Sequence, residues 1–357
     1  MFLRKCFLFN GVVVLLTSEA MLYTQENELA VKCCLCARRC LIKNNSTGFC
    51  SVRKNKNGIL YSLNYGKAVS FGIDNIGKKP LSHFNPGALV ASIAATGCNF
   101  HCQFCDNWTI SQEKTATEKP LPPEEIIKLA KKNNCQGISY TYTEPTIFME
   151  YAYDTAKLAH ETGLFNTFVT NGYMTPETVK LISPYLDAVT VNFKAAGDSN
   201  FYKKTSAVPD VTPIFETLKN FKHENIHIEI TNLVIPKIGD STPQIAHLAK
   251  WINAHLGPNT PFHLLRFHPD YKMSTIPFTS VESLEHAYLV AKGEGLQFVY
   301  FGNMSGHVTE NTYCPACNET VIRRDSFKIT QWNINSDMHC NFCGSQLPIK
   351  GKYYPPQ

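Results

Sequence analysis

Three cysteines stand close together in the segment GCNFHCQFC, at Cys98, Cys102 and Cys105. Their C-x3-C-x2-C spacing puts three thiolates on one short loop, which is enough to hold three corners of a cubane [4Fe–4S] cluster. The fourth iron then lacks a protein ligand and is open to a small molecule. A zinc site that borrows His101 is the alternative. We expect the open cluster, because the loop directly follows a predicted strand.

A second group lies near the C-terminus, at Cys314, Cys317, Cys340 and Cys343. Two C-x2-C pairs separated by 22 residues are typical of a zinc ribbon with four thiolate ligands. Iron, as in rubredoxin, or a cluster would use the same arrangement, and free thiols are the remaining alternative. We predict zinc at this group.

A third group, Cys33, Cys36, Cys40 and Cys50, has intervals of two, three and nine residues. Four thiolates this close in sequence suit either zinc or an auxiliary iron–sulfur cluster, and the spacing leaves both open. The other cysteines of the 14, Cys6, Cys34 and Cys135, are interpreted as buried or incidental thiols.

The elements that must position these groups alternate along the middle of the chain. Apolar strand patterns cover 88–95, 137–142, 165–170, 188–193, 226–234, 262–267 and 296–301, and helical patterns cover 123–132, 146–162, 176–183, 210–221, 242–256 and 281–293. Six βα repeats with a seventh strand predict an α/β fold with a parallel sheet, either doubly wound or a barrel.

Polar candidates follow the predicted strands at their carboxyl ends, where parallel α/β folds place their active sites. In chain order they are the Cys98–Cys105 loop, Glu144, Thr170, Asn171, Gly172, Asn192, Lys194, Asn232 and His268. Alternation along the fourth strand puts Thr190, Asn192 and Lys194 on one face, and along the fifth it separates Asn232 from Glu229 and Thr231.

Length and charge set further limits. A chain of 357 residues suggests about two domains. A net charge of +5 is too mild and too dispersed for a nucleic-acid partner. The apolar run from Cys6 to Leu16 is too short to span a membrane. The run resembles a signal peptide, but clustered thiols need a reducing compartment and favour a cytoplasmic protein. Residues 1–20 are then interpreted as an N-terminal extension, or as the result of a start codon placed too early.

Several motifs together resemble the radical S-adenosylmethionine (SAM) superfamily, and within it the radical SAM enzyme of the AmmeMemoRadiSam system, a relative of pyruvate formate-lyase activating enzyme. The similarity runs from about Glu19 to about residue 349 and includes CCLCARRC…GFC, GCNFHCQFCDNW, YTEPTIF, VTNGY, TNLVIP, RFHPDYKM and NTYCPAC. It implies a partial (β/α)6 barrel at 81–305, flanked by a Cys-rich module at 21–80 and a zinc-ribbon-like module at 306–357.

The resemblance also implies roles at the strand ends. Members use a Gly-Gly-Glu motif to hold the SAM amino group, and the counterpart here, Tyr142-Thr143-Glu144, lacks the glycines. Relatives carry Asp-x-Lys where this chain has Asn192-Phe193-Lys194. Lys194 is the expected partner of the SAM carboxylate, and His268 of the ribose.

Structural alternatives stay open at these positions. Glu144 could instead begin the next helix, where its charge is favoured by the helix dipole. Asn171-Gly172 could instead form only a turn. Lys194 could instead be a solvent-exposed lysine, and His268 could instead have a structural role in the turn before Pro269. Thr170, Asn192 and Asn232 are further cofactor contacts on this reading.

The implied activity is reductive cleavage of SAM to a 5′-deoxyadenosyl radical that abstracts hydrogen from a substrate the sequence does not identify. The expected cofactors are the [4Fe–4S] cluster, SAM and zinc. The expected partners are a reductant such as flavodoxin or ferredoxin, together with Memo-like and AMMECR-like proteins. The alternatives are a glycyl-radical-enzyme activase, a zinc-ribbon nucleic-acid-binding or RNA-modifying protein, and an electron-transfer protein.

Overall fold

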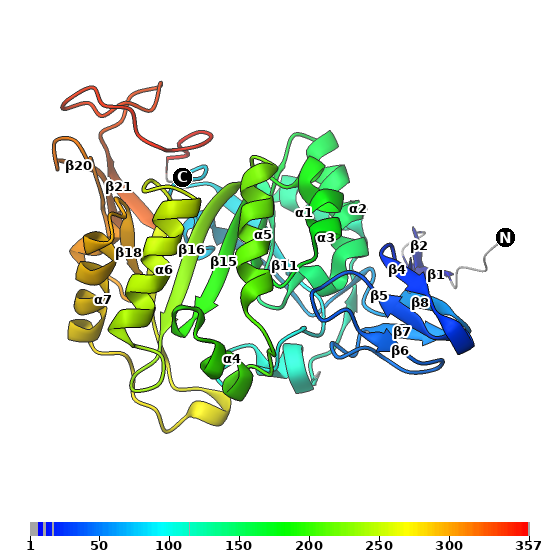
Figure 1. The fold of residues 1–357 in the computed structure, drawn as a ribbon. Helices are drawn as coiled ribbons and strands as arrows, with labels where there is room; N and C mark the ends of the chain where they lie inside the picture. The colour runs from blue at the N-terminus through cyan, green and yellow to red at the C-terminus, as the bar shows by residue number, and fades with distance from the viewer. Residues whose placement is uncertain (1–5, 10–11, 16–17, 114, 356–357) are drawn as a thin grey trace. The chain divides into compact units, whose positions relative to one another are not determined.

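The computed structural model describes residues 6–9, 12–15, 18–113 and 115–355 (Figure 1). The chain divides into two compact units. The first comprises Met1–Asp74, Leu89–Asp187 and Thr212–Ile226, and the second comprises Asn75–Ala88, Ala188–Val211 and His227–Gln357. Each unit contains its own run of parallel strands.

The first unit contains three parallel strands in the order β11 (Leu89–Ala94), β13 (Gly137–Tyr140) and β14 (Phe165–Thr170), with β10 (Ser70–Asn75) next to β11. Nearly every residue of β11 and β13 is buried, as expected for strands covered on both faces. The helices of this unit are α1 (Pro123–Lys132), α2 (Met149–Glu161), α3 (Pro176–Ile182) and α5 (Thr212–His223). Helix α1 buries Ile126, Ile127 and Ala130 and carries acidic residues in its first turn.

The N-terminal part of the first unit consists of short antiparallel strands. Their bounds are β1 (Cys6–Phe9), β2 (Val12–Leu15), β3 (Ser18–Glu19), β4 (Tyr23–Gln25), β5 (Val31–Cys33), β6 (Leu41–Ile42), β7 (Arg53–Lys56), β8 (Ile59–Ser62), β9 (Lys67–Ala68) and β12 (Lys119–Pro120). They pair as β1–β2, β3–β8–β7, β4–β5–β6 and β12–β9. A buried ion pair ties this part to α2: the Arg53 guanidinium lies 2.6 Å from the Glu150 carboxylate, and the two side chains are 2% and 1% exposed.

The second unit contains four parallel strands in the order β15 (Ala188–Lys194), β16 (His227–Val234), β17 (Phe262–Arg266) and β18 (Val299–Gly302). Its helices are α4 (Ser199–Thr205), α6 (Thr242–His255) and α7 (Val281–Gly293). Helices α6 and α7 pack on each other, and α7 also contacts β17 and β18 (Figure 1). Strands β19 (Thr312–Tyr313), β20 (Thr320–Asp325) and β21 (Lys328–Trp332) form a separate antiparallel sheet.

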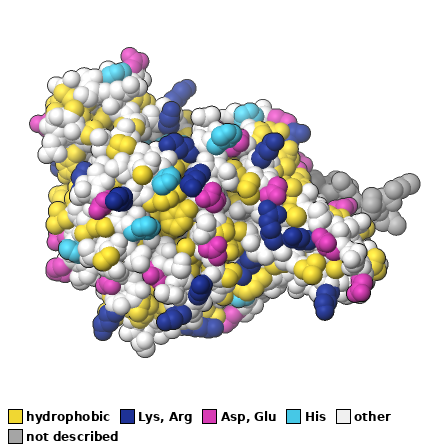
Figure 2. All heavy atoms as spheres, viewed as in Figure 1, with side chains coloured by type: hydrophobic (Ala, Val, Ile, Leu, Met, Phe, Trp, Pro, Cys, Tyr) yellow, Lys and Arg dark blue, Asp and Glu magenta, His cyan; other side chains and the backbone are white. Residues whose placement is uncertain are grey.

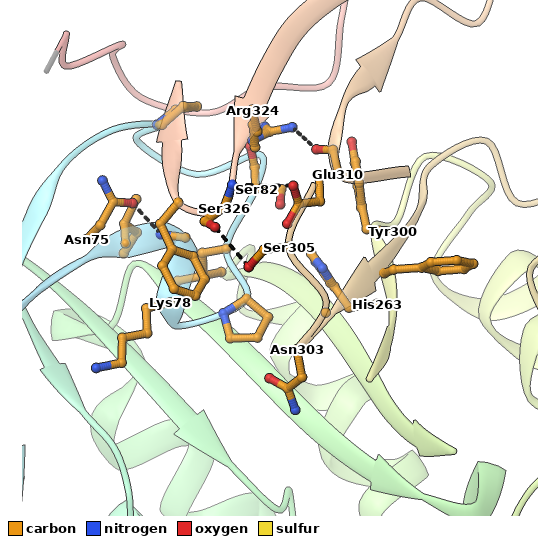
Figure 3. A pocket seen from close by; sticks show the side chains of 18 of the residues that line it. Asn75, Lys78, Ser82, His263, Tyr300, Asn303, Ser305, Glu310, Arg324 and Ser326 are labelled. Atoms are coloured by element: carbon orange, nitrogen blue, oxygen red, sulfur yellow. Dashed lines mark hydrogen bonds between the residues drawn. The ribbon is translucent and has the colours of Figure 1, made fainter. Parts of the chain in front are cut away.

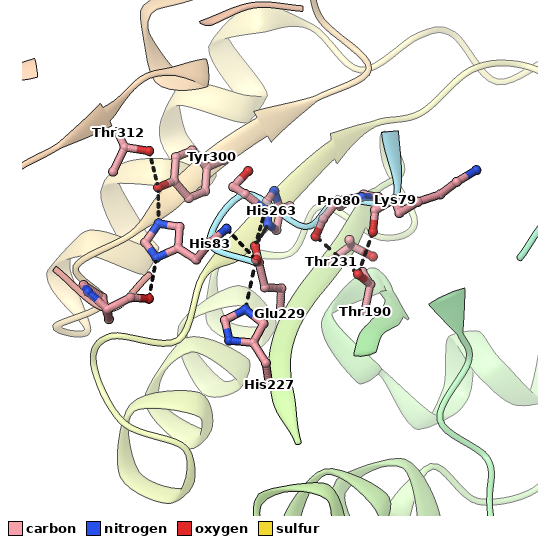
Figure 4. A network of polar contacts seen from close by, with 12 residues as sticks. Lys79, Pro80, His83, Thr190, His227, Glu229, Thr231, His263, Tyr300 and Thr312 are labelled. Carbon is pink, nitrogen blue, oxygen red and sulfur yellow. Dashed lines mark hydrogen bonds and ion pairs between the residues drawn. The ribbon is translucent and has the colours of Figure 1, made fainter. Parts of the chain in front are cut away.

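A buried carboxylate fastens the Asn75–Ala88 segment to the strands of the second unit (Figure 4). Glu229 on β16 accepts from the backbone N–H groups of Ser82 and His83, at 3.0 and 2.7 Å. It also accepts from the imidazoles of His227 and His263, at 3.1 and 2.7 Å. These donors lower the pKa of Glu229 although its burial acts in the opposite direction.

His83 continues the network as a neutral base. Its Nδ1 lies 3.2 Å from the Pro348 carbonyl oxygen, which can only accept, so Nδ1 carries the hydrogen. Its Nε2 then accepts from the Tyr300 hydroxyl at 2.6 Å, and that hydroxyl lies 3.0 Å from the Thr312 hydroxyl. Burial lowers the pKa of His83 to about 3, in agreement with this tautomer.

These elements confirm the predicted α/β fold with a parallel sheet. Helices α1 and α7 and strand β14 have the predicted bounds, and most other boundaries lie within two residues of the prediction. Helix α4, the single π-helical turn at Thr109–Glu113 and the short N-terminal strands were not predicted. The division into modules at 1–20, 21–80, 81–305 and 306–357 stays a prediction.

The described parts of the apolar run near the N-terminus form the antiparallel pair β1–β2, with Cys6 paired to Leu15. The question of a signal-like segment or a mis-set start rests largely on residues 1–5, 10–11 and 16–17, which lie outside the described residues. Of the helices that the structure describes, none has the length and apolar character needed to span a membrane.

Candidate active site and metal centres

The loop that carries Cys98, Cys102 and Cys105 begins directly after β11 and ends in the π-helical turn. Two contacts connect that turn to the loop. The Gln112 amide donates to the Cys102 carbonyl at 2.8 Å, and the Ser111 hydroxyl lies 3.4 Å from Cys105 Sγ. A π-helical turn is rare and is often found at functional sites. The three thiols therefore stand on a loop with a fixed backbone at the carboxyl end of a strand.

Asn99 connects this loop to the end of β14. Its Oδ1 accepts from the Asn171 side-chain amide at 2.6 Å. Its own Nδ2 is fully buried and has no hydrogen-bond partner among the described residues. A buried amide without a hydrogen-bond partner lowers the stability of the fold, so an acceptor bound beside Cys98 would be stabilising. The sulfur atoms of a cluster bound at Cys98 would supply one.

Glu144 joins the ends of β13 and β14. Its Oε1 accepts from the Thr170 hydroxyl at 2.7 Å and from the Thr146 backbone N–H at 3.1 Å. Its Oε2 accepts from the Asn171 backbone N–H at 2.7 Å. The side chain is only 2% exposed, and its burial raises the pKa of the carboxyl group even though these donors lower it.

Cys98, Asn99, Asn171 and Glu144 thus form one hydrogen-bonded chain across three strand ends. The structure brings together the predicted active-site residues of the first unit, which are the three cysteines, Glu144, Thr170, Asn171 and Gly172. Glu144 caps the following 3-10 turn through Thr146, as its structural interpretation predicts, and it also accepts from the Asn171 backbone N–H. Each carboxylate oxygen of Glu144 accepts at least one hydrogen bond from this chain, and its contact with SAM stays a prediction.

The spacing of the active-site thiols favours a cluster over a single ion. Four thiolates around one zinc lie about 3.8 Å apart, from a Zn–S distance of about 2.3 Å. The Sγ atoms of the four C-terminal cysteines all lie within 4.8 Å of one another. In the described part of the chain, no other group of three or more His, Cys, Asp or Glu side chains is as close. Cys98, Cys102 and Cys105 do not form such a close set, which favours a polynuclear cluster over a single ion.

The C-terminal group has the dimensions of a single-ion site. The Sγ atoms of Cys314 and Cys343 lie 3.6 Å apart, and those of Cys317 and Cys340 lie 3.8 Å apart. Both C-x2-C pairs fold as the same turn, in which the N–H four residues after the first cysteine donates back to its carbonyl at 2.8 Å. The residues at that position, Asn318 and Gly344, have φ of 61° and 76°. The arrangement suits a closed zinc site, and iron would use the same ligands.

The remaining predicted residues lie in the second unit. Asn192 and Lys194 share one face of β15, as alternation predicts, and Asn192 Oδ1 accepts from the Thr231 hydroxyl on β16 at 2.6 Å. The Lys194 ammonium donates to the Asn192 carbonyl at 3.0 Å. These contacts leave the proposed bond between Lys194 and the SAM carboxylate untested.

Asn232 and His268 take different positions. Asn232 is buried, and its Oδ1 accepts from the Ala196 backbone N–H at 2.7 Å, while its Nδ2 has no partner among the described residues. His268 is exposed, with its ring edge against Phe278 at 4.9 Å between centroids. Both stay predictions as cofactor contacts.

A cavity of about 330 Å³ opens in the second unit at the carboxyl ends of β17 and β18 (Figure 3). Strand residues His263 and Tyr300 line its base, and the loop after β18 contributes Asn303 and Ser305. Residues of the β20–β21 hairpin form another wall: Arg324, Ser326, Phe327 and Ile329. The C-terminal module therefore shapes a cavity at strand ends, as well as containing four clustered cysteines.

The surface carries no single-signed stripe on the face that Figure 2 shows, where Lys and Arg side chains are interspersed with Asp and Glu. A net charge of +5 over 357 residues agrees with this distribution. The view therefore adds nothing in favour of a nucleic-acid-binding protein.

Sequence reasoning missed Asn99, Arg53 and Glu150. Asn99 lies inside the cysteine motif, and its position between two proposed ligands was the available signal. Arg53 and Glu150 are 97 residues apart, and neither belongs to a local pattern.

Comparison with known families finds the Radical SAM superfamily over residues 92–249. This range begins within β11 and includes the cysteine loop, Glu144, Asn171 and Asn192. The match therefore covers the active-site chain described above.

Two proteins of Methanocaldococcus jannaschii are similar to this chain. "Uncharacterized protein MJ0808" is 43% identical over 334 residues, which cover 93% of this chain and 99% of that protein. "Uncharacterized protein MJ0674" is 23% identical and covers 75% and 76% of the two chains. The pyruvate formate-lyase-activating enzyme of Clostridium pasteurianum is 23% identical over 199 residues, which cover 50% of this chain and 80% of that enzyme.

Solved structures with some similarity include Streptococcus suis SuiB bound to S-adenosylmethionine, at 15% identity and a TM-score of 0.47. The alignment covers 62% of this chain and 52% of SuiB. A domain of pyruvate-formate lyase-activating enzyme from Bacteroides vulgatus aligns at 18% identity and a TM-score of 0.41, over 47% of this chain and 99% of that domain.

Proposed function

Because residues 92–249 of this chain match the radical SAM superfamily, we propose that the chain cleaves SAM reductively at a [4Fe–4S] cluster held by Cys98, Cys102 and Cys105. One electron from a low-potential carrier protein, such as flavodoxin or ferredoxin, breaks the bond between sulfur and C5′. The products are methionine and a 5′-deoxyadenosyl radical, and the radical takes a hydrogen atom from the substrate to give 5′-deoxyadenosine.

The observation that carries this proposal is the hydrogen-bonded chain from the cysteine loop through Asn99 and Asn171 to Glu144. It fixes three thiols at a strand end and leaves an unpartnered amide beside Cys98. Bound there, the cluster would supply an open iron for SAM. The residues of this chain position the ligand loop.

Anaerobic reconstitution followed by an assay for 5′-deoxyadenosine, with dithionite and SAM, tests the activity. Wild type should form the product, and Cys102→Ala should not. Cys135→Ala is the matched control, because this thiol is buried outside the loop and should be dispensable. Product formation by Cys102→Ala at the wild-type rate would contradict the assignment.

The AmmeMemoRadiSam resemblance supports a finer proposal about substrate. A protein, or a small molecule presented by a Memo-like or AMMECR-like partner, would be held by the two cysteine-rich modules. The cavity of the second unit supports this, since the β20–β21 hairpin forms one of its walls. We further propose a cytoplasmic location, in which the thiols stay reduced.

Blocking the cavity provides the test. Ser305→Trp places a large ring in it, whereas Thr330→Trp alters an exposed residue of β21 that does not line it. Ser305→Trp should abolish any stimulation of SAM cleavage by the partner and leave the unstimulated rate unchanged. Equal stimulation of SAM cleavage in both variants would show that the cavity is not part of the substrate site.

A second candidate function is a glycyl-radical-enzyme activase, favoured by the similarity to the Clostridium pasteurianum activating enzyme. An activase transfers the radical to a glycine of a protein partner. Electron paramagnetic resonance (EPR) of a mixture with such an enzyme would show a stable glycyl radical if this second candidate is correct.

A further inference from the structure

The four cysteines of the N-terminal module line one small cavity in the first unit. Cys33, Cys36, Cys40 and Cys50 all face it, although 17 positions separate the first from the last. The backbone brings them together, because the Cys33 N–H donates to the Cys40 carbonyl at 2.9 Å. Four thiols around one cavity form a complete ligand set for a metal centre.

A buried cation accompanies these thiols. Arg53 lines the same cavity and is 2% exposed, and its positive charge acts on the thiols of Cys33 and Cys50. Metal ligands must be thiolates, and four thiolates bring more negative charge than one divalent ion neutralises. Arg53 also pairs with Glu150, but Arg53 is the member of that pair that lines the cavity, so the cationic end favours thiolates there.

The spacing of the thiols separates a cluster from zinc. No three of these four Sγ atoms lie within 4.8 Å of one another, whereas all four C-terminal thiols do. The same chain thus contains a close-packed four-thiol site and a wider one. Cys98, Cys102 and Cys105 form no close set either. A polynuclear cluster holds its ligands at separate corners and requires such a spacing.

The cavity lies directly against the active-site loop. Asn99, the neighbour of Cys98, is one of its lining residues, and the Arg38 guanidinium donates to the Asn99 carbonyl at 2.6 Å. Gly97 makes the close approach possible. A Cβ at that position would lie 3.0 Å from the Cys50 carbonyl oxygen and 2.9 Å from Val52 Cγ1.

Aromatic contacts reinforce this junction. The Phe49 ring stacks on His101 of the active-site loop at 4.1 Å between centroids. The Arg38 guanidinium covers the Phe49 ring at 3.5 Å. The module is therefore packed onto the loop from both sides of Cys98.

We propose that Cys33, Cys36, Cys40 and Cys50 bind a second [4Fe–4S] cluster next to the active-site loop. All four of its irons have a thiolate ligand, so it has no open position and does not bind SAM. This inference stands apart from the proposed function, because it concerns metal content and not SAM cleavage.

The test removes the first cluster and counts what remains. In full-length protein reconstituted anaerobically, the triple variant Cys98→Ala, Cys102→Ala, Cys105→Ala leaves the N-terminal module unchanged. It should retain about four irons and about four acid-labile sulfides per chain. Wild type should contain about twice as much of each, with about one zinc from the C-terminal group.

Two single variants localise the second centre. Cys36→Ser in the triple-variant background should lose the remaining iron and sulfide, whereas Cys34→Ser should retain both. Cys34 is the matched control, because it lies between two proposed ligands in sequence and does not line the cavity. A triple variant with a second zinc, with iron but no sulfide, or with no metal at the module would overturn the proposal.

EPR supplies a readout of proximity. In reduced wild type, two adjacent clusters should interact magnetically and broaden or split the signal. The triple variant should show the simpler spectrum of one isolated cluster. A wild-type spectrum equal to the sum of two independent signals would contradict the placement beside Asn99.

Discussion

At the scale of single residues, the site depends on buried polar groups that have a fixed set of partners. Glu144 is a clear case, because donors from two strand ends converge on a carboxylate that solvent does not reach. Such a group stabilises the fold while all its partners are in place and destabilises it when one is mismatched.

Glu144→Gln should therefore destabilise the protein by about 1–3 kcal/mol. The amide keeps one acceptor for the threonine hydroxyls, but its NH2 group then faces the Asn171 N–H, and two donors meet. Denaturant unfolding measures the loss, and the 5′-deoxyadenosine rate should fall with it because the Asn171 loop loosens. Glu161→Gln, an exposed change on α2, is the control. Equal stabilities in the two variants would contradict the role of Glu144.

The Arg53–Glu150 pair predicts a larger effect. Arg53→Met leaves the Glu150 carboxylate buried without its cation, which costs about 3–5 kcal/mol in comparable buried pairs. Lys219→Ala removes one partner of an exposed pair on α5, where both side chains are about half exposed, and should cost less than about 1 kcal/mol. Chemical unfolding of both variants tests the difference. A cost for Arg53→Met no greater than that for Lys219→Ala would show that burial of the pair is unimportant.

At the scale of elements, the Asn75–Ala88 segment makes the second unit sensitive to acid. His83 has a pKa of about 3 when folded and its ordinary value of 6.5 when unfolded, and Glu229 has a lowered pKa. Both groups bind more protons in the unfolded chain, so stability should fall as pH drops from about 6.5. Each proton that unfolding takes up changes the free energy of unfolding by up to about 1.4 kcal/mol per pH unit.

The variant His83→Asn should flatten this slope between pH 5 and 6.5, as measured by denaturant unfolding at a series of pH values. His255→Asn, an exposed change on α6, should leave the slope as in wild type. An unchanged slope in His83→Asn would show that protons are taken up elsewhere.

The C-terminal module makes a prediction about zinc. Cys340→Ala removes a buried ligand and should eliminate about one zinc per chain while the iron content stays at the wild-type level. Elemental analysis measures both. A point variant is preferable to removal of the whole module, because the module also supplies Arg324, which donates to the Ser82 carbonyl. Retention of zinc by Cys340→Ala would contradict the site.

At the scale of the whole molecule, local patterns predicted the elements that repeat. Helix α1 has an apolar stripe and acidic residues at its start, and strand β14 lies between clear turn signals, so their bounds followed from sequence. The ligand cysteines of the C-terminal site followed from paired spacing, and the structure places their Sγ atoms together.

Long-range contacts explain what local patterns missed. The Glu229 carboxylate and the His83 backbone that it holds are 146 residues apart, and no periodicity links them. The choice between zinc and a cluster at the N-terminal cysteines likewise depends on distances between thiols. Spacing in sequence left it open, and only the folded loops carry the information.

The central claim is reductive cleavage of SAM, and one measurement tests it most directly. Methionine and 5′-deoxyadenosine should be quantified together in a single anaerobic reaction of reconstituted wild type with dithionite and SAM. Homolysis at C5′ predicts that the two products appear in equal amounts and only in the presence of reductant. Formation of S-adenosylhomocysteine in their place, or no product from a protein with a full complement of iron, would contradict the account.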